Sequence, residues 1–243
     1  MREWQFLLDG RCEPGYNMHR DTDLFKEIKC GSAVGYLRIY NWQRPAVTIG
    51  YHQKSFKPYD TGLRIPIVPR PTGGGAVLHV DDLTFSISVS EKNLPDQGLM
   101  ESYALLTKPF AYAFNQCGFD AKFEDQPFKF SEICFARSAP KELTIDGRKI
   151  MGAAQLRRKG CLLQQGVIPL RTDQKLARQV FGPGFLSRQV GIFELWPDFS
   201  LEQFIAHLRD GFAAEMDVFF TDAYQNETQY KHTYQSKIDS GRN

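Results

Sequence analysis

Hydrophobic and polar residues alternate over residues 36–42, where Leu37 and Ile39 share one side and Arg38 stands between them. A period of two residues predicts a half-buried β-strand at this position. Shorter apolar runs predict further strands at residues 4–8, 46–49, 76–80, 83–89, 143–145, 149–155 and 162–170.

Short polar turns separate two pairs of these predicted strands. Asp81-Asp82 lies between 76–80 and 83–89, and Asp146-Gly147 lies between 143–145 and 149–155. Because acidic residues and glycine favour tight turns between apolar runs, each pair is predicted to form a β-hairpin.

Apolar residues recur every three or four positions in four other segments. This spacing predicts helices over residues 17–30, 102–117, 173–180 and 201–212. Asn17 is the predicted N-cap of the first helix, because an asparagine side chain can accept a hydrogen bond from the first turn. Hairpins interrupted by helices predict an α+β fold with mixed or antiparallel β-sheets.

The chain shows no internal repeat and no linker-like segment before its polar end. Residues 1–220 are therefore predicted to form a single catalytic-type domain. Residues 221–243 are polar and poor in aliphatic side chains, so they are predicted to form a loosely attached helix or a disordered tail.

Composition narrows the class of protein. A chain of 243 residues with 42% hydrophobic residues can bury a core without disulfides or metal. Its 30 basic and 28 acidic residues lack the strong basic excess of a nucleic-acid binder. No apolar run reaches membrane-spanning length and no signal-peptide pattern is present, so we expect a cytoplasmic protein with no membrane or nucleic-acid partner.

Cysteine and aromatic usage refine this picture. Five cysteines without a C-x-x-C pair argue against a disulfide framework and against zinc, and the scattered histidines give no metal site. Aromatic residues make up 13% of the chain. This excess is typical of a strand-rich core, and the alternative is an apolar channel for a greasy ligand.

Three consecutive glycines follow Arg70-Pro71-Thr72. Gly73, Gly74 and Gly75 lack Cβ atoms, so their backbone N–H groups can approach a carboxylate, a phosphate or an acyl carbonyl. The spacing matches neither a P-loop nor a dinucleotide-binding motif. Taken alone, the segment could also be an ordinary flexible turn.

Three isolated residues have possible chemical roles. Lys149 follows a turn and precedes the small residues 152–154, which leave room for a ligand beside its amine. Cys134 could be a nucleophile if a neighbouring cation stabilises its thiolate, or an inert packed thiol. His79 could bind a ligand or be a buried imidazole with satisfied hydrogen bonds.

Two motifs in this order resemble the family of lipoate–protein ligases and octanoyl/lipoyl transferases, which is related to biotin–protein ligases. They are Pro-Arg-Pro-Thr-Gly-Gly-Gly-Ala-Val-Leu-His at 69–79 and Gly-Arg-Lys-Ile-Met-Gly-Ala-Ala-Gln at 147–155. Asn17-Met18, the segment 47–53, Gly166 and the segment 201–220 support the resemblance, which covers roughly residues 4–220. The resemblance implies a biotin/lipoate ligase-like catalytic domain.

The resemblance also implies an acyl group, an acceptor and site residues. The family attaches lipoate or octanoate to one lysine of a small carrier, either the glycine cleavage H protein or a lipoyl domain of a 2-oxo acid dehydrogenase. Cys134 and Lys149 are the implied catalytic residues. The implied substrate-binding residues are Arg70, Thr72, Gly73, Gly74, Gly75, Ala76, His79, Gly152, Ala153 and Gln155.

The motif details favour the Cys-dependent octanoyltransferase branch, which takes the acyl group from an octanoyl or lipoyl donor and needs no cofactor. Cys134-Phe135 followed by Lys141-Glu142-Leu143 resembles that branch, and the Asn-Asp pair of ligases is missing. Gly75 is ligase-like, because octanoyltransferases of this type often have Arg there. Gln165-Gly166-Val167 also replaces the more usual His-Gly-Ser.

Two alternatives therefore stay open. One is an ATP- and Mg-dependent lipoate–protein ligase that forms a lipoyl-adenylate. The other is a non-catalytic protein that binds acyl or lipoyl carriers.

Overall fold

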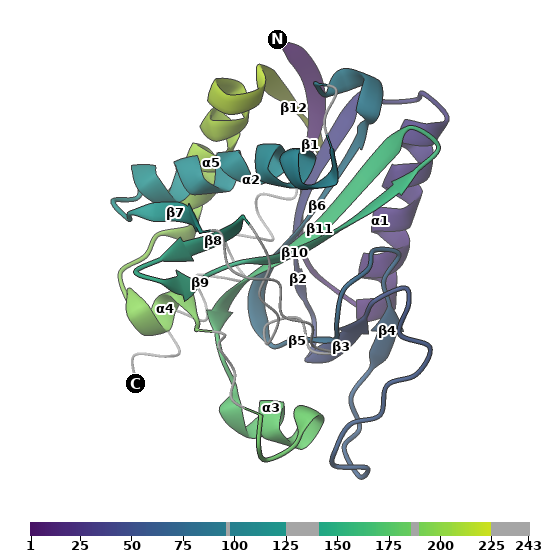
Figure 1. Cartoon of the computed structure of the whole chain (residues 1–243), viewed down its shortest axis with the longest axis vertical. Coiled ribbons are helices and arrows are strands. Elements are labelled where there is room, and N and C mark those ends of the chain that lie inside the picture. The colour runs from purple at the N-terminus through teal and green to yellow at the C-terminus, as the bar shows by residue number, and fades with distance from the viewer. Residues whose placement is uncertain (96–97, 125–140, 186–189, 225–243) are drawn as a thin grey trace.

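A six-stranded mixed β-sheet forms the centre of the computed structural model, which describes residues 1–95, 98–124, 141–185 and 190–224 (Figure 1). In spatial order its strands are β10 (Gly152–Arg158), β11 (Cys161–Arg171), β6 (Asp81–Ser90), β2 (Gly35–Trp42), β1 (Arg2–Cys12) and β12 (Val218–Tyr224). Pairing is antiparallel from β10 to β2 and parallel from β2 to β12. The predicted α+β class with mixed sheets is confirmed.

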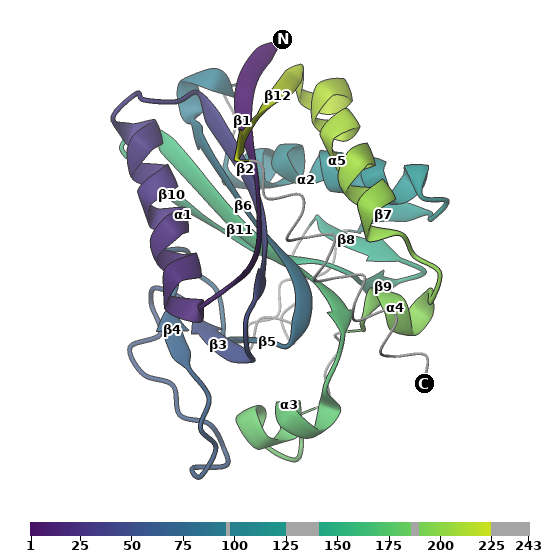
Figure 2. The same cartoon turned by 180° about the vertical axis from the view of Figure 1, so that it is seen from behind.

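Helices cover both faces of this sheet (Figures 1 and 2). Helix α1 (Pro14–Lys29) packs Leu24 and Phe25 on one face. Helices α2 (Leu99–Gln116) and α5 (Leu201–Met216) cover the other face. There they join the largest core cluster, whose fully buried aromatic side chains are Trp4, Phe85, Phe110, Phe114, Phe204 and Phe212. The aromatic excess of the sequence therefore lies mainly in the core.

Strand β2 shows why the prediction of a half-buried strand was wrong. Every residue of β2 is buried, because the sheet is covered on both faces. Leu37 and Ile39 face the core under α2 and α5, whereas Tyr36 packs under α1. Arg38 is fully buried and is neutralised by two aspartates, Asp9 and Asp21.

The start of α1 also differs from the prediction. The helix begins at Pro14, and Glu13 occupies the N-cap position in an extended conformation. Proline suits the first turn because its missing N–H would have no helical partner there. Asn17 is not a cap but a fully buried residue inside the helix, and its Nδ2 donates to the backbone oxygen of Asn41 at 3.1 Å.

Two three-stranded sheets flank the central one. The first has the order β4 (Ile67–Pro69), β3 (Ala46–Ile49), β5 (Val77–His79), and the second has the order β7 (Ala121–Glu124), β8 (Glu142–Ile145), β9 (Arg148–Lys149). The predicted hairpin of 76–80 with 83–89 is wrong, because β5 pairs with β3. Both edges of β6 are already occupied by β2 and β11.

The second predicted hairpin forms, but its later strand is divided. β8 pairs with β9 across the Asp146-Gly147 turn. The chain then passes buried Ile150 and Met151 and enters the central sheet as β10, which pairs with β11. Lys149 and Gly152 therefore lie in different sheets, close to the junction between them.

The remaining described elements are short. They are the 3₁₀ helix η1 (Glu91–Asn93), helix α3 (Gln174–Phe181) and helix α4 (Ile192–Leu195). Residues 221–224, predicted as a helix or a disordered tail, instead belong to strand β12 beside β1. Among the helices that the structure describes, none has the length and hydrophobicity to cross a membrane.

Candidate active site

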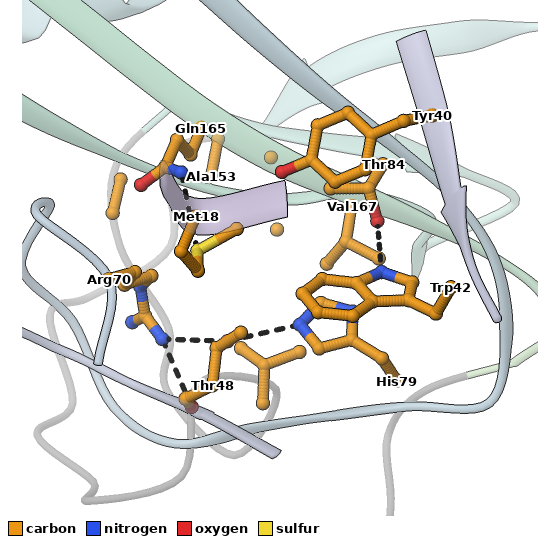
Figure 3. A pocket seen from close by; sticks show the side chains of 14 residues that line it. Met18, Tyr40, Trp42, Thr48, Arg70, His79, Thr84, Ala153, Gln165 and Val167 are labelled. Atoms are coloured by element: carbon orange, nitrogen blue, oxygen red, sulfur yellow. Dashed lines mark hydrogen bonds between the residues drawn. The ribbon is translucent and has the colours of Figure 1, made fainter. Parts of the chain in front are cut away.

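A pocket opens where the central sheet meets the β4-β3-β5 sheet (Figure 3). The cavity itself measures about 30 Å³, and its mouth is open to solvent. The lining residues come from α1, from six strands and from Arg70: Met18, Tyr40, Trp42, Thr48, Arg70, Val77, His79, Thr84, Gly152, Ala153, Ala154, Gln165, Gly166 and Val167. Apolar and small side chains of α1, β5, β10 and β11 therefore line the pocket together with polar side chains of β3, β5, β6 and β11.

Arg70 braces the glycine loop from within the protein. Its side chain is buried, and its Nη2 donates to the backbone oxygens of Gly73 and Gly75, each at 2.7 Å. Its Nη1 donates to the backbone oxygen and the hydroxyl of Thr48, both at 3.2 Å. The planar guanidinium thus fixes the loop against strand β3.

Glycine is required at two places in this loop and its support. Gly74 has φ +95°, a left-handed backbone conformation that side-chain-bearing residues rarely adopt. Gly50 follows β3, and a Cβ atom there would lie 2.1 Å from the backbone oxygen of Gly74. The loop therefore packs directly on the chain that leaves β3.

A buried chain of hydrogen bonds runs from Arg70 through Thr48 to His79 (Figure 3) and continues to Asp82. The Thr48 hydroxyl lies 3.0 Å from Nε2 of His79, and Nδ1 of His79 lies 2.8 Å from Asp82. Arg70 can only donate to Thr48, so the hydroxyl is free to donate to Nε2 while Nδ1–H donates to Asp82. In this arrangement every group has a hydrogen-bond partner.

Trp42 fixes the other side of His79. The two rings stack with centroids 4.0 Å apart and an interplanar angle of 24° (Figure 3). Nε1 of Trp42 donates to the Thr84 hydroxyl at 2.8 Å, and that hydroxyl donates to Asp82 at 2.7 Å. Asp82 therefore receives hydrogen bonds from both His79 and Thr84, which hold its carboxylate in place.

A second buried network centres on Asp21 of α1. Its carboxylate accepts hydrogen bonds from Arg38 at 2.8 Å, from Ser86 at 2.7 Å and from Gln165 at 2.7 Å. The amide oxygen of Gln165 in turn accepts from the Thr72 hydroxyl at 2.8 Å. Gln165 thus links the base of the pocket to the residue that precedes the three glycines.

The structure brings together part of the predicted set. Arg70, His79, Gly152 and Ala153 line the pocket. Thr72 contacts the lining residue Gln165, Gly73 and Gly75 contact Arg70, and Gly74 lies between these two glycines. Ala76 is fully buried in the small core under the β4-β3-β5 sheet. Gln155 faces α2, where its amide pairs with Gln164 at 2.7 Å and with Ser102 at 3.4 Å.

Lys149 lies outside the pocket lining. Its Nζ donates to Oε1 of Glu142 at 2.5 Å, and both side chains are largely buried, at 13% and 8% exposed. The pair spans the β8–β9 hairpin, three residues before Gly152. The amine therefore keeps a carboxylate partner at the junction that leads into the pocket.

Cys134 lies outside the described residues, so its position relative to the pocket stays a prediction. The four described cysteines are all free, and none lines the pocket. Burial raises the pKa of Cys12, Cys117 and Cys161, which disfavours their thiolates. The buried Cys161 thiol is therefore a poor nucleophile.

Several lining residues were not predicted from the sequence. In the sequence, Thr48, Thr84 and Trp42 look like ordinary strand residues, because only the fold reveals their hydrogen-bond partners. For Gln165 the sequence offered one indication of a role in the site, because this residue replaces the more usual His beside Gly166. Within the described ranges, no group of three or more His, Cys, Asp or Glu side chains could hold a metal ion.

Similarity to known proteins extends over most of the chain. The family model of the lipoyl protein ligase A/B catalytic domain matches residues 13–213. The chain belongs to this family. An octanoyltransferase LipM from Lysinibacillus sphaericus is 32% identical over 96% of this chain and 94% of the relative. A second, from Exiguobacterium sibiricum, is 35% identical over 72% of this chain and 68% of that protein.

Solved structures support the lipoyl ligase A/B fold. A lipoate-protein ligase A bound with ATP superposes with a TM-score of 0.72 at 23% identity, covering 98% of this chain and 94% of that one. A bi-partite lipoate protein ligase from Thermoplasma acidophilum, solved with its E2 lipoyl domain, gives 0.67 at 23% identity, with 98% and 93% coverage. At this identity the likeness concerns the fold alone.

Proposed function

We propose that the protein transfers an octanoyl or lipoyl group to a lysine of a small lipoyl carrier domain. The observation that carries this proposal is the match to proteins named octanoyltransferase LipM along nearly the whole of both chains. The pocket supports it, because apolar and polar walls meet there within one cavity.

The apolar wall suits an acyl chain. Met18, Val77 and Val167 line the pocket beside the small residues of β10. Burying six methylenes of an octanoyl chain contributes a gross driving force of about 5 kcal/mol, at about 0.8 kcal/mol per CH₂. Small side chains at Gly152 and Ala153 leave space for a chain to lie along the sheet.

The polar wall suits the acyl carbonyl. Arg70 occupies the backbone oxygens of Gly73 and Gly75, so the loop's amide N–H groups are what it offers to a substrate. Backbone donors held in a fixed position stabilise the negative charge that develops on a carbonyl oxygen during acyl transfer. The hydrogen bonds from Arg70 to the loop would keep those donors in position before the substrate arrives.

The proposed reaction has two steps. The Cys134 thiolate attacks the thioester of the octanoyl donor, a new thioester forms on Cys134, and the donor carrier leaves as a thiolate that takes up a proton from solvent. The neutral amine of the acceptor lysine then attacks this thioester, an amide forms, and the Cys134 thiol is released. We assign to Lys149 the cation that stabilises the thiolate and the developing oxyanion, with Glu142 holding its amine.

This reaction needs neither ATP nor Mg. The proposed partners are an octanoyl donor and an acceptor of the lipoyl-domain or glycine cleavage H protein type. Gly75 favours the competing ligase function, in which the same pocket would bind a lipoyl-adenylate. A carrier-binding protein without chemistry would give no turnover with either substrate.

Intact mass spectrometry tests the proposal. Incubation with octanoyl-loaded carrier and no acceptor should give an adduct on this protein that hydroxylamine removes. The adduct should be absent in Cys134→Ala and present in Cys161→Ala, the matched cysteine control. Acylation of an acceptor domain by Cys134→Ala at the wild-type rate with lipoate and ATP would establish the ligase function instead.

A further inference from the structure

A lobe of irregular chain and one helix protrudes beside the pocket. This basic lobe consists of residues 50–66, which link β3 to β4, and residues 171–185, which contain α3. Both segments lie at the same end of the molecule, away from the N-terminus (Figures 1 and 2). They are joined by backbone hydrogen bonds from Tyr59 to Val180 at 3.0 Å and from Asp60 to Gln179 at 2.8 Å.

The lobe carries an unusual share of positive charge. Its two segments contain six basic and two acidic residues, whereas the whole chain has 30 basic and 28 acidic residues. Both acidic side chains serve the local fold. Asp60 accepts hydrogen bonds from the Gly62 backbone and from Gln179, and Asp173 caps α3 through the Leu176 N–H.

Five of the six basic side chains have no carboxylate partner among the described residues. They are Lys54, Lys57, Arg64, Lys175 and Arg178, and all five are exposed. Arg171 alone approaches a carboxylate, that of Asp81 at 3.8 Å. Some exposed basic residues elsewhere, such as Lys26, Arg44 and Lys122, pair with a neighbouring acid, and the lobe differs in gathering five cations, unpaired in the described part of the chain, on two adjacent segments. The lobe therefore presents uncompensated cations to solvent.

An open groove and exposed tyrosines lie among these cations. Tyr59, Lys175, Arg178 and Gln179 line an open groove between the loop and α3. Tyr59 is 67% exposed, and Tyr51 at the base of the lobe is 69% exposed. Tyrosine is a residue type that protein interfaces favour, because it offers apolar area together with a hydroxyl group.

The lobe is continuous with the rim of the candidate active site. The Tyr51 N–H donates to the Thr72 backbone oxygen at 2.9 Å, and Gly50 packs on the backbone of Gly74. A protein seated on the lobe would therefore lie beside the glycine loop. From there, one of its side chains could enter the pocket.

We propose that the basic lobe docks an acidic face of the acceptor domain that carries the target lysine. This inference rests on the proposed function. The acyl donor can be selected by its chain within the pocket, but the amine of one lysine is chemically the same as that of any other. Selection of one lysine must therefore come from a surface outside the pocket, and positive potential both recruits and orients an acidic partner.

Reversing three charges of the lobe tests this assignment. The variant Lys57→Glu/Lys175→Glu/Arg178→Glu changes exposed side chains only. We expect its KM for an acidic apo H protein or lipoyl domain to rise at least tenfold. The KM for the octanoyl donor and the kcat at saturating acceptor should stay within twofold of wild type. The acceptor KM of wild type should also rise with salt, and that of the variant should not.

A matched control reverses three cations at the opposite end of the molecule. Lys29, Lys92 and Arg158 are exposed and lack a carboxylate partner in the described ranges. The variant Lys29→Glu/Lys92→Glu/Arg158→Glu has the same net charge as the lobe variant. It should keep the wild-type acceptor KM, because the proposed docking depends on cations of the basic lobe and not on the total charge of the protein.

The outcomes separate the docking surface from the proposed function. A higher donor KM in the lobe variant would assign the lobe to the donor carrier and overturn the inference, as would equal effects in both triple variants. If wild type transfers no acyl group, the proposed function fails. Calorimetric titration of the apo acceptor domain into the three proteins then still decides whether the lobe binds it.

Discussion

Thr48 uses both hydrogen-bonding capacities of its hydroxyl. It accepts from Arg70 and donates to His79, so one side chain connects the brace of the glycine loop to the His79–Asp82 pair. Both neighbours are buried and cannot replace this partner with bulk water. The position therefore matters for geometry, although Thr48 supplies no reactive group.

Thr48→Val should lower kcat/KM for acyl transfer by about tenfold to a hundredfold. Leaving a buried polar group without its partner costs about 1–3 kcal/mol, which corresponds to this range. Steady-state kinetics of folded protein gives the readout. Thr107→Val is the control, because Thr107 is also buried, but its hydroxyl donates to Tyr103 and accepts from Gln164, and neither residue lines the pocket. Equal activity losses in both variants would refute the positioning role.

Gly74→Ala should inactivate transfer while leaving the protein folded. Alanine is strained at φ +95°, so the loop must shift and its amide groups lose their alignment. Gly118→Ala provides the comparison, since Gly118 has φ +89° at the end of α2 and open space around it. Both variants should lose about 1 kcal/mol of stability, measured by urea unfolding, and only Gly74→Ala should lose activity. A fully active Gly74→Ala protein would exclude the loop from the site.

At the scale of elements, α1 is tied to the sheet by a buried ion pair. Arg38 of β2 and Asp21 of α1 are both fully buried and lie 2.8 Å apart. Asp21→Ala leaves the guanidinium with an incomplete set of partners, which typically costs about 3–5 kcal/mol. Thermal unfolding should show this as a large fall in Tm.

An exposed ion pair gives the contrast for that measurement. Arg44 and Glu13 lie 3.0 Å apart with 59% and 49% of their side chains exposed. Arg44→Ala should change the free energy of unfolding by less than about 1 kcal/mol, since water screens such pairs. Similar Tm values for the two variants would contradict the role of the buried pair.

The same elements show what the sequence can reveal. The positions of most strands and helices follow from local periodicity, and the glycine loop and His79 stand close together in one motif. Thr48 and Gln165 were missed because their hydrogen-bond partners are distant in the sequence. His79 lies 31 residues from Thr48, and Asp21 lies 144 residues from Gln165. The burial of Arg38 was missed for the same reason, since its neutralising aspartates come from α1 and β1.

The failed hairpin has a related cause. Asp81 and Asp82 have the composition of a turn, but they begin strand β6, and the chain bends just before them at Val80. Asp82, however, holds His79 and Thr84 at a corner between two sheets. A local signal reports that the chain changes direction, but the strand partners are decided by contacts with β2, β3 and β11.

At the scale of the whole molecule, β12 completes the far edge of the central sheet. Phe220 packs against Phe6, Phe212 and Trp4, with ring centroids 5.7, 5.3 and 6.5 Å away. Phe220→Ala should lower the free energy of unfolding by about 2 kcal/mol or more. Phe219→Ala, on the 39% exposed neighbouring residue, should cost less than about 0.5 kcal/mol in the same urea titration. Equal costs would show that β12 does not pack on the core as described.

The parallel pairing of β1 with β12 also affects how the protein is made. Arg2 at the start of β1 donates to the backbone oxygen of Met216, 214 residues later in the chain. At about 5–20 residues per second, a ribosome needs roughly 10–40 seconds to synthesise that interval. During this time β1 can pair with β2, but its other edge has no strand to bind. The nascent chain therefore exposes an unpaired strand edge beside Trp4 and Phe6 until β12 has been synthesised, and this edge is where binding by a chaperone would protect it from aggregation.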